Sequence, residues 1–598
     1  MLRSLLSQPR TRSVLQKSVG FGSASYISLS LSTPLRIDSR SNSAMAAQDE
    51  EVGEKGQQSM LASQRAKEQG EAAAPQGRFA KWFPLSAKAG LDQWWANQSP
   101  MATEHRVLSF VPHLQSPPTH TQTGTATPDT DTEATAPPKQ AEDHTTTNSH
   151  NDPYGPRRWN SQMVELGGKD RALNEFSVER LGEEVENNLV MLHGYGAGLG
   201  FFYRNFESIS RSEGWKVYAL DLLGMGRSSR PNFRIHAKDT EAKVTEAESW
   251  FIDALEEWRI KRGLERFTLL GHSLGGYLAV AYALKYPGHL NKLILASPVG
   301  IPEDPYAVNE DLPDPQESTM ANEFAQDASE TRNGVQPSTA DNNNFMNQAR
   351  KADAAPKDAK QPPKRRLPAW LYYLWEANMI SPFTFVRWSG PLGPRLVSGW
   401  TSRRFSQLPE EEAQALHDYS YALFRQRGSS EYALAYLLAP GAFARSPLIR
   451  RIQGVGRQYL DANTTSSPSF SSSSTSPTTQ PPDTTTNDTT TNDTTNPAPR
   501  PREPSYPIIF LYGENDWMDV AGGYAAQEKI KQERARILAA ASPQDGASDV
   551  GEAKVVVIRK AGHHVYLDGW EQFNAVLAEE MEEVRRREGG RGRKRGVS

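Results

Sequence analysis

The 598-residue chain contains no cysteine. This absence excludes disulfide bonds, thiol nucleophiles and cysteine-ligated metal sites, and it gives no support to a secreted fold held together by disulfides. Long hydrophobic runs are also missing, because no stretch reaches the ~18 uninterrupted apolar residues that a bilayer-spanning helix requires. We therefore expect any contact with a membrane to be made from its surface.

A dominant charge of one sign is missing as well. The chain carries 67 lysine and arginine residues and 71 acidic residues, for a formal net charge of -4. Such a balanced chain generates no overall field that attracts nucleic acid, and we predict no nucleic-acid partner. The basic C-terminal residues RRREGGRGRKRGVS are interpreted as a solvated tail.

Acidic residues are absent from the start of the chain up to Asp38. This stretch instead contains several arginines and many serines, a composition typical of a mitochondrial transit peptide. A secretory signal would need a continuous apolar segment, which Gln8, Pro9 and Arg10 interrupt. We predict a transit peptide over residues 1–45, with a disordered tail as the alternative.

Two tracts rich in Thr and Pro, Thr121 to Asn148 and Ser466 to Pro499, divide the rest of the chain. Their composition cannot bury enough apolar surface to offset the entropy lost on ordering, so we predict that both are disordered. The predicted regions after the transit peptide are a largely disordered N-terminal region with an aromatic segment at 81–95 (46–154), the first part of a core (155–303), a disordered insertion (304–365), a helical cap (366–460), a disordered insertion (461–505), the second part of the core (506–586) and a basic tail (587–598).

Short apolar runs rich in β-branched residues alternate with helix-length segments in the two core parts. The runs are NNLVMLHG, WKVYALDLLG, RFTLLGHS, NKLILASPVG, YPIIFLYG and AKVVVIRKAG. Residues 246–262 and 276–286 have helical patterns between them. Continuous apolar strands separated by helices predict an α/β fold, with a mostly parallel sheet, helices on both faces and the helical cap inserted into it.

The strongest chemical signal is GHSLGG at residues 271–276, between a predicted strand and a predicted helix. This is the G-x-S-x-G pattern of a nucleophile elbow, in which the serine stands at a sharp, strained turn. The glycines two positions before and after Ser273 let the strand and helix approach each other. We predict that Ser273 is a catalytic nucleophile, with a structural turn as the alternative.

An acyl-transfer serine also needs N–H donors for the developing oxyanion. The residue after the nucleophile, Leu274, supplies the first predicted donor. The glycine-rich turn HGYGAG that follows the earliest predicted strand supplies the second, and we assign it to the Tyr195 N–H. The alternative for the glycines is a merely flexible turn.

Serine requires a histidine base and an acid that holds the histidine, in the chain order serine, acid, histidine for this topology. After the strand YPIIFLYG comes GENDWMD, in which Asp516 is the first choice as acid and Asp519 the alternative. A helix-capping role for Asp516 is also open. After the last predicted strand, His563 is the predicted base.

The base lies in AGHHVYLDG, which permits a second interpretation. His563 and Asp568 form an H-x4-D pattern that is typical of a self-contained acyl-transfer motif. In the triad interpretation, His564 is structural and Asp568 caps the helix that begins near Trp570.

Two further segments have expected roles. DLLGMGRSSRP follows a strand, and we expect Asp221 and its glycines to shape the loop under the active site. The segment Pro368 to Phe405 interleaves aromatic residues with Arg387, Arg395, Arg403 and Arg404, a composition suited to the headgroup boundary of an anionic membrane. A helical cap with an aromatic core is the alternative.

Six segments together resemble one family. HGYGAGLGFFYRNF, DLLGMGRSSRPNF, GHSLGGYLAVAYALKYP, GPLGPRL, GENDWMD and AGHHVYLD are similar to the α/β-hydrolase branch that includes lysophosphatidic acid acyltransferases, N-acylphosphatidylethanolamine lipases and the lipid-droplet lipase coactivator. Within it, the transit-like start and long inserts resemble the fungal mitochondrial cardiolipin-specific deacylases. The resemblance covers nearly all of the three globular pieces and none of the inserts.

The resemblance implies an α/β-hydrolase fold and an enzyme acting on phospholipid, with a triad of Ser273, His563 and either Asp516 or Asp519. The coactivator members lack the serine that is present here, which favours catalysis over a purely binding role. We predict no metal and no cofactor.

The primary hypothesis is a serine hydrolase that deacylates cardiolipin at the mitochondrial inner membrane, to which it binds peripherally. The alternatives are a lysophospholipid acyltransferase that uses the H-x4-D pattern and a noncatalytic lipid-surface scaffold.

Overall fold

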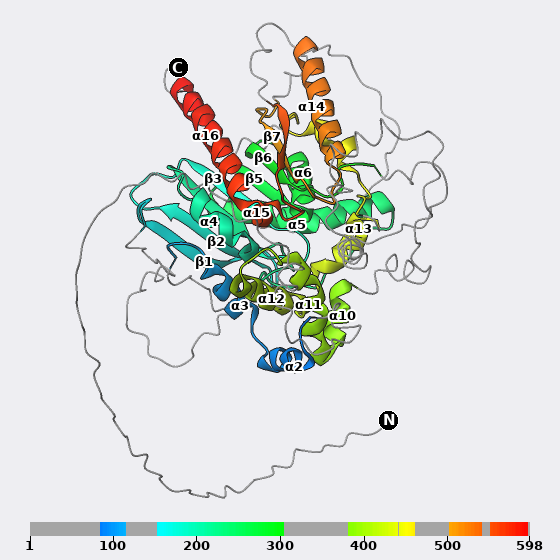
Figure 1. Ribbon diagram of the computed structural model, residues 1–598. Helices are drawn as coiled ribbons and strands as arrows, with labels where there is room; N and C mark the ends of the chain where they lie inside the picture. Colours follow the sequence, from blue (N-terminus) through cyan, green and yellow to red (C-terminus); the bar gives the residue numbers. More distant parts are fainter. Residues whose placement is uncertain are drawn as a thin grey trace, which may run out of the picture. The chain divides into compact units, whose positions relative to one another are not determined.

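An eight-stranded sheet forms the centre of the computed structural model, which describes residues 84–114, 152–303, 381–439, 442–460, 502–540 and 551–595 (Figure 1). The strands are β1 (Arg157–Glu165), β2 (Ala172–Arg180), β3 (Asn187–Leu192), β4 (Trp215–Leu220), β5 (Phe267–His272), β6 (Leu290–Ala296), β7 (Ile508–Gly513) and β8 (Ala553–Ile558). Their order across the sheet is β1-β2-β4-β3-β5-β6-β7-β8. The strands from β4 to β8 are mutually parallel, whereas β2 is antiparallel to both neighbours. The predicted mostly parallel α/β fold is confirmed.

The six apolar runs coincide with the six parallel strands. In β5, β6 and β7 every residue is buried, as expected for strands covered by helices on both faces. The antiparallel pair of β1 and β2 is missed by a search for apolar runs. In β1 buried residues mostly alternate with more exposed ones, because it is an edge strand with one better covered face.

Helices cover both faces of the sheet (Figure 1). The core helices are α4 (Tyr203–Ile209), α5 (Thr240–Arg262), α6 (Leu274–Lys285), α14 (Val520–Ala540), α15 (Val565–Asp568) and α16 (Trp570–Arg595). Val190 and Leu192 of β3 pack in one apolar core with α5 and α6. Leu189 and Met191 pack in the other, with α4 and α16. Successive side chains of one strand therefore serve opposite layers.

Between β6 and β7 the chain forms a cap, of which residues 381–439 and 442–460 are described. Its elements include α10 (Pro382–Trp388), the 3-10 turn η2 (Gly390–Leu392), α11 (Gly393–Arg404), α12 (Glu410–Phe424), the 3-10 turn η3 (Ser430–Ala433) and α13 (Leu434–Leu437). The described part of the cap thus has helices and turns, with no strand among its named elements.

Two helices lie within the region 46–154, which the sequence predicts to be largely disordered. They are α2 (Ala87–Ala96) and α3 (Pro100–Leu108), together named the N-terminal helix pair. Ser86 and Ser99 cap their first turns by accepting hydrogen bonds from backbone N–H groups. α2 packs on α11 and η2, and α3 packs on α12 and on η1 (Leu199–Phe202). Tertiary packing explains why these short segments are helical despite a weak sequence pattern.

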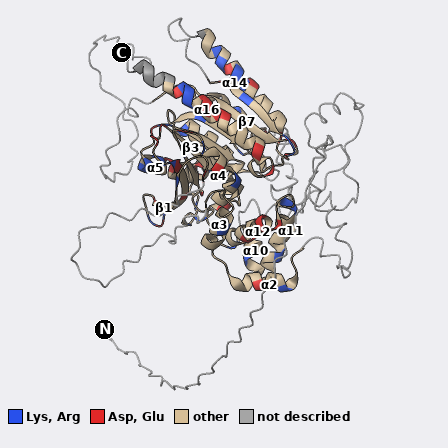
Figure 2. Cartoon of the chain, turned by 60° about the vertical axis from the view of Figure 1, so that its left-hand side comes forward, with Lys and Arg blue, Asp and Glu red and all other residues tan. Residues whose placement is uncertain are grey.

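Several sequence predictions lie outside the described residues, namely the transit peptide and nearly all of the insertions 304–365 and 461–505. At the C-terminus, α16 continues to Arg595, through most of the predicted basic tail. Basic and acidic residues are mixed along α14 and α16 (Figure 2). Within the described ranges, none of the helices combines the length and apolar character needed to cross a membrane.

Candidate active site

Ser273 stands at the turn between β5 and α6. Its backbone has φ 52° and ψ -115°, a conformation that non-glycine residues rarely adopt. A Cβ at Gly271 would lie 2.3 Å from the Gly275 carbonyl oxygen, and one at Gly275 would lie 2.7 Å from that of Leu192. The glycines are therefore required for close packing around the turn. This strained, over-determined geometry is that of a nucleophile elbow.

The segment from His193 to Gly200, named the oxyanion loop, lies against this turn. A Cβ at Gly194 would be only 3.0 Å from the Ser273 Cβ. Leu274 is the first residue of α6, so its N–H has no carbonyl one turn earlier within the helix. Neither this N–H nor that of Tyr195 donates a hydrogen bond to another described residue. Both predicted oxyanion donors therefore remain available beside the serine.

His193 fixes the peptide that carries the Tyr195 N–H. Burial lowers the pKa of His193 to about 4, so the ring is neutral at physiological pH. Its Nε2 accepts the Leu222 N–H at 3.0 Å, which leaves the proton on Nδ1 to be donated to the Gly194 carbonyl at 2.7 Å. In a trans peptide the carbonyl and N–H point in opposite directions. The bond to Gly194 thus turns the Tyr195 N–H away from the His193 ring.

Asp516 and His563, the predicted acid and base, lie within hydrogen-bonding distance of each other. The His563 Nδ1 lies 3.1 Å from the Asp516 Oδ1, and both side chains are buried. The Met518 N–H donates to the same oxygen at 3.0 Å, and Trp517 packs beside the imidazole with ring centroids 4.8 Å apart. Asp519 instead accepts the Ala521 N–H at the start of α14. Asp516 has the partner that an orienting acid requires, and Asp519 has that of a helix cap.

The elbow and the histidine loop meet through the residue before the nucleophile. His272 Nε2 lies 3.1 Å from the His563 carbonyl oxygen, and the two rings have centroids 4.8 Å apart. The Ser273 hydroxyl makes no hydrogen bond to His563 within the described chain. Catalytic hydrogen bonds commonly tighten only when substrate binds, so the missing bond does not contradict a triad of Ser273, His563 and Asp516.

Asp568 does not cap α16, contrary to the expectation from sequence. Its Oδ2 accepts the Gly562 N–H at 3.0 Å and an N–H of Arg404 at 3.0 Å, and its Oδ1 contacts Gln407. Helix α16 begins only at Trp570, after Gly569. The Asp568 carboxylate points instead to the preceding loop, because Arg404 of the cap binds it there. The H-x4-D residues His563 and Asp568 are therefore linked through Gly562, not by direct contact.

His564 is buried beside the triad without joining it. Its Nδ1 accepts a hydrogen bond from the Arg404 Nε at 2.6 Å. Burial, with Arg404 nearby, lowers its pKa well below the ordinary value, so the ring stays neutral. Sequence reasoning predicts its structural role but not Arg404, which reaches the histidine loop from α11.

The cap arginines serve mainly as internal links. Arg387 pairs with Glu431 at 2.6 Å, and the Arg395 Nε donates to the Leu85 carbonyl. Arg404 is bound to the histidine loop, so these three arginines, which were expected to face phosphate, have partners inside the protein. The aromatic residues divide as well: Phe383 and Trp400 are buried and Phe385 and Trp388 exposed, while Trp370, Tyr372, Tyr373 and Trp375 lie outside the described residues.

The loop after β4 supports the oxyanion loop, as expected. Asp221 is fully buried and accepts N–H groups of Leu199 and Arg227, both at 2.7 Å. A Cβ at Gly226 would lie 2.1 Å from the Asp221 carboxyl carbon, so this carboxylate fits only against glycine.

A possible metal-ligand group lies elsewhere, at His113, Asp152 and Glu207, whose ligand atoms are within 4.8 Å of one another. Arg157 already pairs with both carboxylates. We assign no metal to it, because a guanidinium occupies the position of a cation.

Comparison with known proteins agrees with the α/β fold. The family model described as alpha/beta hydrolase fold matches residues 187–371. A 1-acylglycerol-3-phosphate O-acyltransferase from Arabidopsis thaliana is 31% identical over 401 residues, covering 66% of each chain. Human 1-acylglycerol-3-phosphate O-acyltransferase ABHD5 is 32% identical over 285 residues, which are 47% of this chain and 63% of that protein.

A third relative is the human (lyso)-N-acylphosphatidylethanolamine lipase, 26% identical over 400 residues that cover 66% of this chain and 79% of the lipase. The chain spans about two thirds of the length of the acyltransferase relatives that it matches. The chain belongs to the α/β-hydrolase family, in the branch that contains the ABHD5-type acyltransferases and the N-acylphosphatidylethanolamine lipase.

Proposed function

We propose that the protein is a serine acyl hydrolase that removes a fatty acyl chain from a glycerophospholipid, and that cardiolipin is its substrate. The observation that carries the proposal is the strained Ser273 elbow beside a buried pair of His563 and Asp516. A backbone strained at one serine, next to a histidine held by a carboxylate, is the arrangement of nucleophilic acyl transfer.

The reaction follows from the position of each group. His563 takes the proton of the Ser273 hydroxyl as its oxygen attacks the ester carbonyl, while Asp516 orients the imidazole and stabilises its positive charge. The N–H groups of Tyr195 and Leu274 bind the resulting oxyanion. His563 then protonates the departing lysophospholipid oxygen. Water, deprotonated by the same imidazole, attacks the acyl-enzyme and releases the fatty acid and free Ser273.

The substrate and location are inferred from three features. The family relatives are named for reactions of acyl lipids. The N-terminal composition is typical of a transit peptide, and this start together with the long inserts resembles the fungal mitochondrial cardiolipin-specific deacylases. Cardiolipin is an anionic mitochondrial phospholipid, so we propose a peripheral position on the mitochondrial inner membrane, with monolysocardiolipin as the product.

An exposed apolar surface supports approach to a membrane. It comprises Leu91, Trp94 and Trp95 of α2 with Phe385, Trp388 and Leu392 of α10 and η2, and is named the aromatic surface. These side chains retain exposed fractions of 36% to 79%. Helix α2 packs on η2 and α11, so the six residues belong to adjoining elements. Exposed tryptophans suit the interface between water and lipid.

The test uses full-length protein and vesicles containing either cardiolipin or phosphatidylcholine. Mass spectrometry should detect monolysocardiolipin and free fatty acid with the wild type, and at least ~1000-fold less product with Ser273→Ala. Equal product from Ser273→Ala would exclude the serine mechanism. Deacylation of phosphatidylcholine at the same rate would retain the hydrolase and reject cardiolipin specificity.

An acyltransferase is the second candidate, favoured by the names of the Arabidopsis and ABHD5 relatives. In this reaction a lysophospholipid hydroxyl replaces water in attacking the acyl group. Adding lysophosphatidic acid and an acyl donor to the assay separates the candidates, because only a transferase forms phosphatidic acid. If neither product forms while vesicle binding persists, the protein acts as a noncatalytic lipid-surface scaffold.

The mitochondrial location needs its own test. A fusion of residues 1–45 to a fluorescent protein should enter mitochondria, whereas the same fusion with its arginines replaced by glutamine should remain outside. Carbonate extraction of mitochondria containing the full chain should release the protein if its attachment is peripheral.

A further inference from the structure

We propose that Glu104, on helix α3 of the N-terminal helix pair, is a positioning residue for the oxyanion loop. The inference rests on the proposed acyl-transfer function. It assigns a task to a helix that precedes both the sheet and the segment matched by the family model.

Glu104 is a fully buried carboxylate among polar partners. Its Oε1 accepts a hydrogen bond from the Arg227 Nη1 at 2.5 Å. Its Oε2 accepts from the Asn174 Nδ2 at 3.3 Å and from the Tyr419 hydroxyl at 3.1 Å. Burying a carboxylate is costly unless it is paired and hydrogen-bonded. An apolar residue would satisfy packing alone, so the charge indicates a more specific task.

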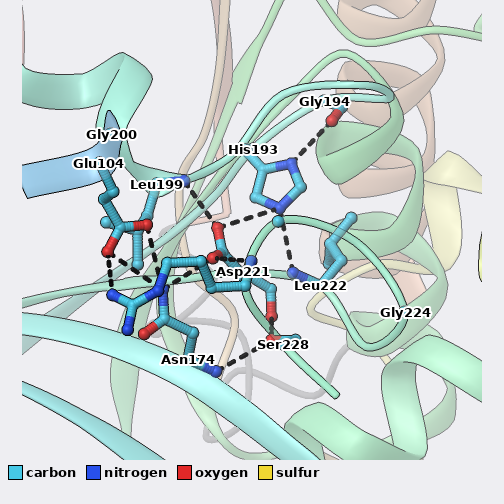
Figure 3. A network of polar contacts seen from close by, with 12 residues as sticks. Glu104, Asn174, His193, Gly194, Leu199, Gly200, Asp221, Leu222, Gly224 and Ser228 are labelled. Atoms are coloured by element: carbon cyan, nitrogen blue, oxygen red, sulfur yellow. Dashed lines mark hydrogen bonds and ion pairs between the residues drawn. The ribbon is translucent and has the colours of Figure 1, made fainter. Parts of the chain in front are cut away.

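One connection from Glu104 reaches the oxyanion loop through the core. Arg227 pairs with Glu104 through its side chain, and its backbone N–H donates to Asp221. The other Asp221 oxygen accepts the Leu199 N–H at 2.7 Å and lies 3.6 Å from the His193 Nε2. Figure 3 shows Glu104, Asp221 and His193 in one network that continues to the Gly194 carbonyl.

The second connection passes through the cap. The Tyr419 hydroxyl donates to Glu104 and accepts the Gly200 N–H at 3.4 Å. The Tyr419 ring packs so closely on the loop that a Cβ at Gly198 would lie 2.3 Å from its hydroxyl oxygen. Glu104 is thus connected to two consecutive amides, that of Leu199 through Arg227 and Asp221 and that of Gly200 through Tyr419.

The two connections act on the part of the loop that follows the predicted donor. Leu199 and Gly200 begin η1, where the loop ends and α4 follows. If these amides are released, the segment from Gly194 to Gly198 loses its C-terminal anchor, and the Tyr195 N–H moves relative to Ser273. A displacement of ~1 Å at a reacting group costs up to ~100-fold in rate.

A purely structural role makes a different prediction, and the chain provides a matched control. Arg106, also on α3, pairs with Asp418 of α12 at 2.6 Å. This pair joins the same two helices as Glu104 and Tyr419. Neither Arg106 nor Asp418 contacts the oxyanion loop by a hydrogen bond in the described chain. Loss of helix attachment should therefore appear in Arg106→Gln, whereas loss of loop positioning should not.

The experiment compares Glu104→Gln, Tyr419→Phe, the double variant and Arg106→Gln in the full chain. With a soluble p-nitrophenyl ester, we expect Glu104→Gln to lower kcat roughly tenfold with KM within about twofold, and Tyr419→Phe to lower it less. The double variant should fall short of the product of the single losses, because both residues serve one network. Arg106→Gln should keep the wild-type kcat.

Hydrogen exchange of a peptide containing Leu199 and Gly200 provides a readout that does not depend on activity. Exchange should accelerate several-fold in Glu104→Gln and Tyr419→Phe, but not in Arg106→Gln. Unchanged exchange and kcat in both loop variants, or equal losses in Arg106→Gln, would overturn the inference. A wild type without esterase activity would instead reject the proposed function, and exchange would still decide the role of Glu104. If Glu104→Gln does not fold, Tyr419→Phe decides both measurements.

Discussion

The Asp568 carboxylate accepts a hydrogen bond at 3.0 Å from the N–H of Gly562, the residue directly before the predicted base His563. The same oxygen is bound by Arg404 from the cap. In this chain the H-x4-D pattern therefore does not mark a directly contacting pair of His563 and Asp568. Its aspartate fixes the backbone that presents the histidine and joins that backbone to α11.

Replacing Asp568 by asparagine should lower hydrolysis by roughly tenfold without abolishing it, because the amide keeps the shape but loses the charge that holds Arg404. Arg404→Gln should have a similar effect, and the double variant little more. Steady-state kinetics of the three variants provide the measurement. If Asp568→Ala abolishes acyl transfer to lysophosphatidic acid while Ser273→Ala spares it, the H-x4-D transferase mechanism holds instead.

Asp516 and Asp519 should separate sharply by mutation. Asp516→Asn should reduce kcat by ~1000 to 10000-fold, because the imidazole loses the carboxylate that fixes its tautomer and stabilises its charge. Asp519→Asn should alter kcat by less than about threefold, since its carboxylate only caps the start of α14. Asp516 and Asp519 are only three positions apart after the same strand, so the two variants form a matched pair. A larger loss in Asp519→Asn would assign the acid role to Asp519.

The central sheet was accessible from sequence because buried parallel strands are uniformly apolar. Each apolar run from NNLVML to AKVVVI became a strand in the predicted layer arrangement. The β1 and β2 pair lies at the edge, where RRWNSQMVE mixes buried and exposed positions and resembles an ordinary polar segment. The N-terminal helix pair was not predicted for another reason, because these two short helices are stabilised by contacts with cap residues 310 and 312 positions away.

The parts of the site that follow a strand end were predictable, since topology brings strand ends to one edge of a parallel sheet. Ser273, Asp516 and His563 belong to this class. Glu104, Arg404 and Tyr419 do not, because nothing in a single sequence indicates which buried charge meets which loop. A glutamate in the helix PMATEHRVL would be expected from sequence to face solvent, yet it is fully buried.

The aromatic surface should control binding to vesicles without affecting the catalytic centre. Trp95→Ala with Trp388→Ala should weaken binding to cardiolipin-containing vesicles by roughly tenfold or more, because both rings are largely exposed and can transfer to the interface. Activity on a soluble ester should remain within about twofold of the wild type. Flotation and ester hydrolysis measure the two effects.

A control for this surface is Tyr524→Ala, which removes another exposed aromatic ring, located on α14. This variant should bind vesicles like the wild type. Equal weakening by Tyr524→Ala, or full binding by the double tryptophan variant, would contradict the assignment of the membrane-facing side.

His417 should make stability depend on pH. Burial lowers its pKa from 6.5 to about 4 in the folded chain, where its nitrogens contact Thr401 and Gln93. The unfolded chain therefore binds a proton first on acidification. The contribution of His417 to the free energy of unfolding therefore has its full value above pH ~6.5 and decreases as the pH falls toward ~4. At about pH 5 the loss amounts to about 2 kcal/mol, obtained from the two pKa values.

The variant His417→Gln isolates this contribution, because His193, His272 and His564, whose pKa values burial also lowers, titrate in both proteins. Denaturant unfolding of both chains at about pH 7.5 and about pH 5 gives four free energies. The wild type should lose about 2 kcal/mol more than the variant over this interval, whatever their difference at the higher pH. Parallel losses in the two proteins would mean that His417 takes up its proton equally well when folded, and that Thr401 and Gln93 accommodate the charged ring.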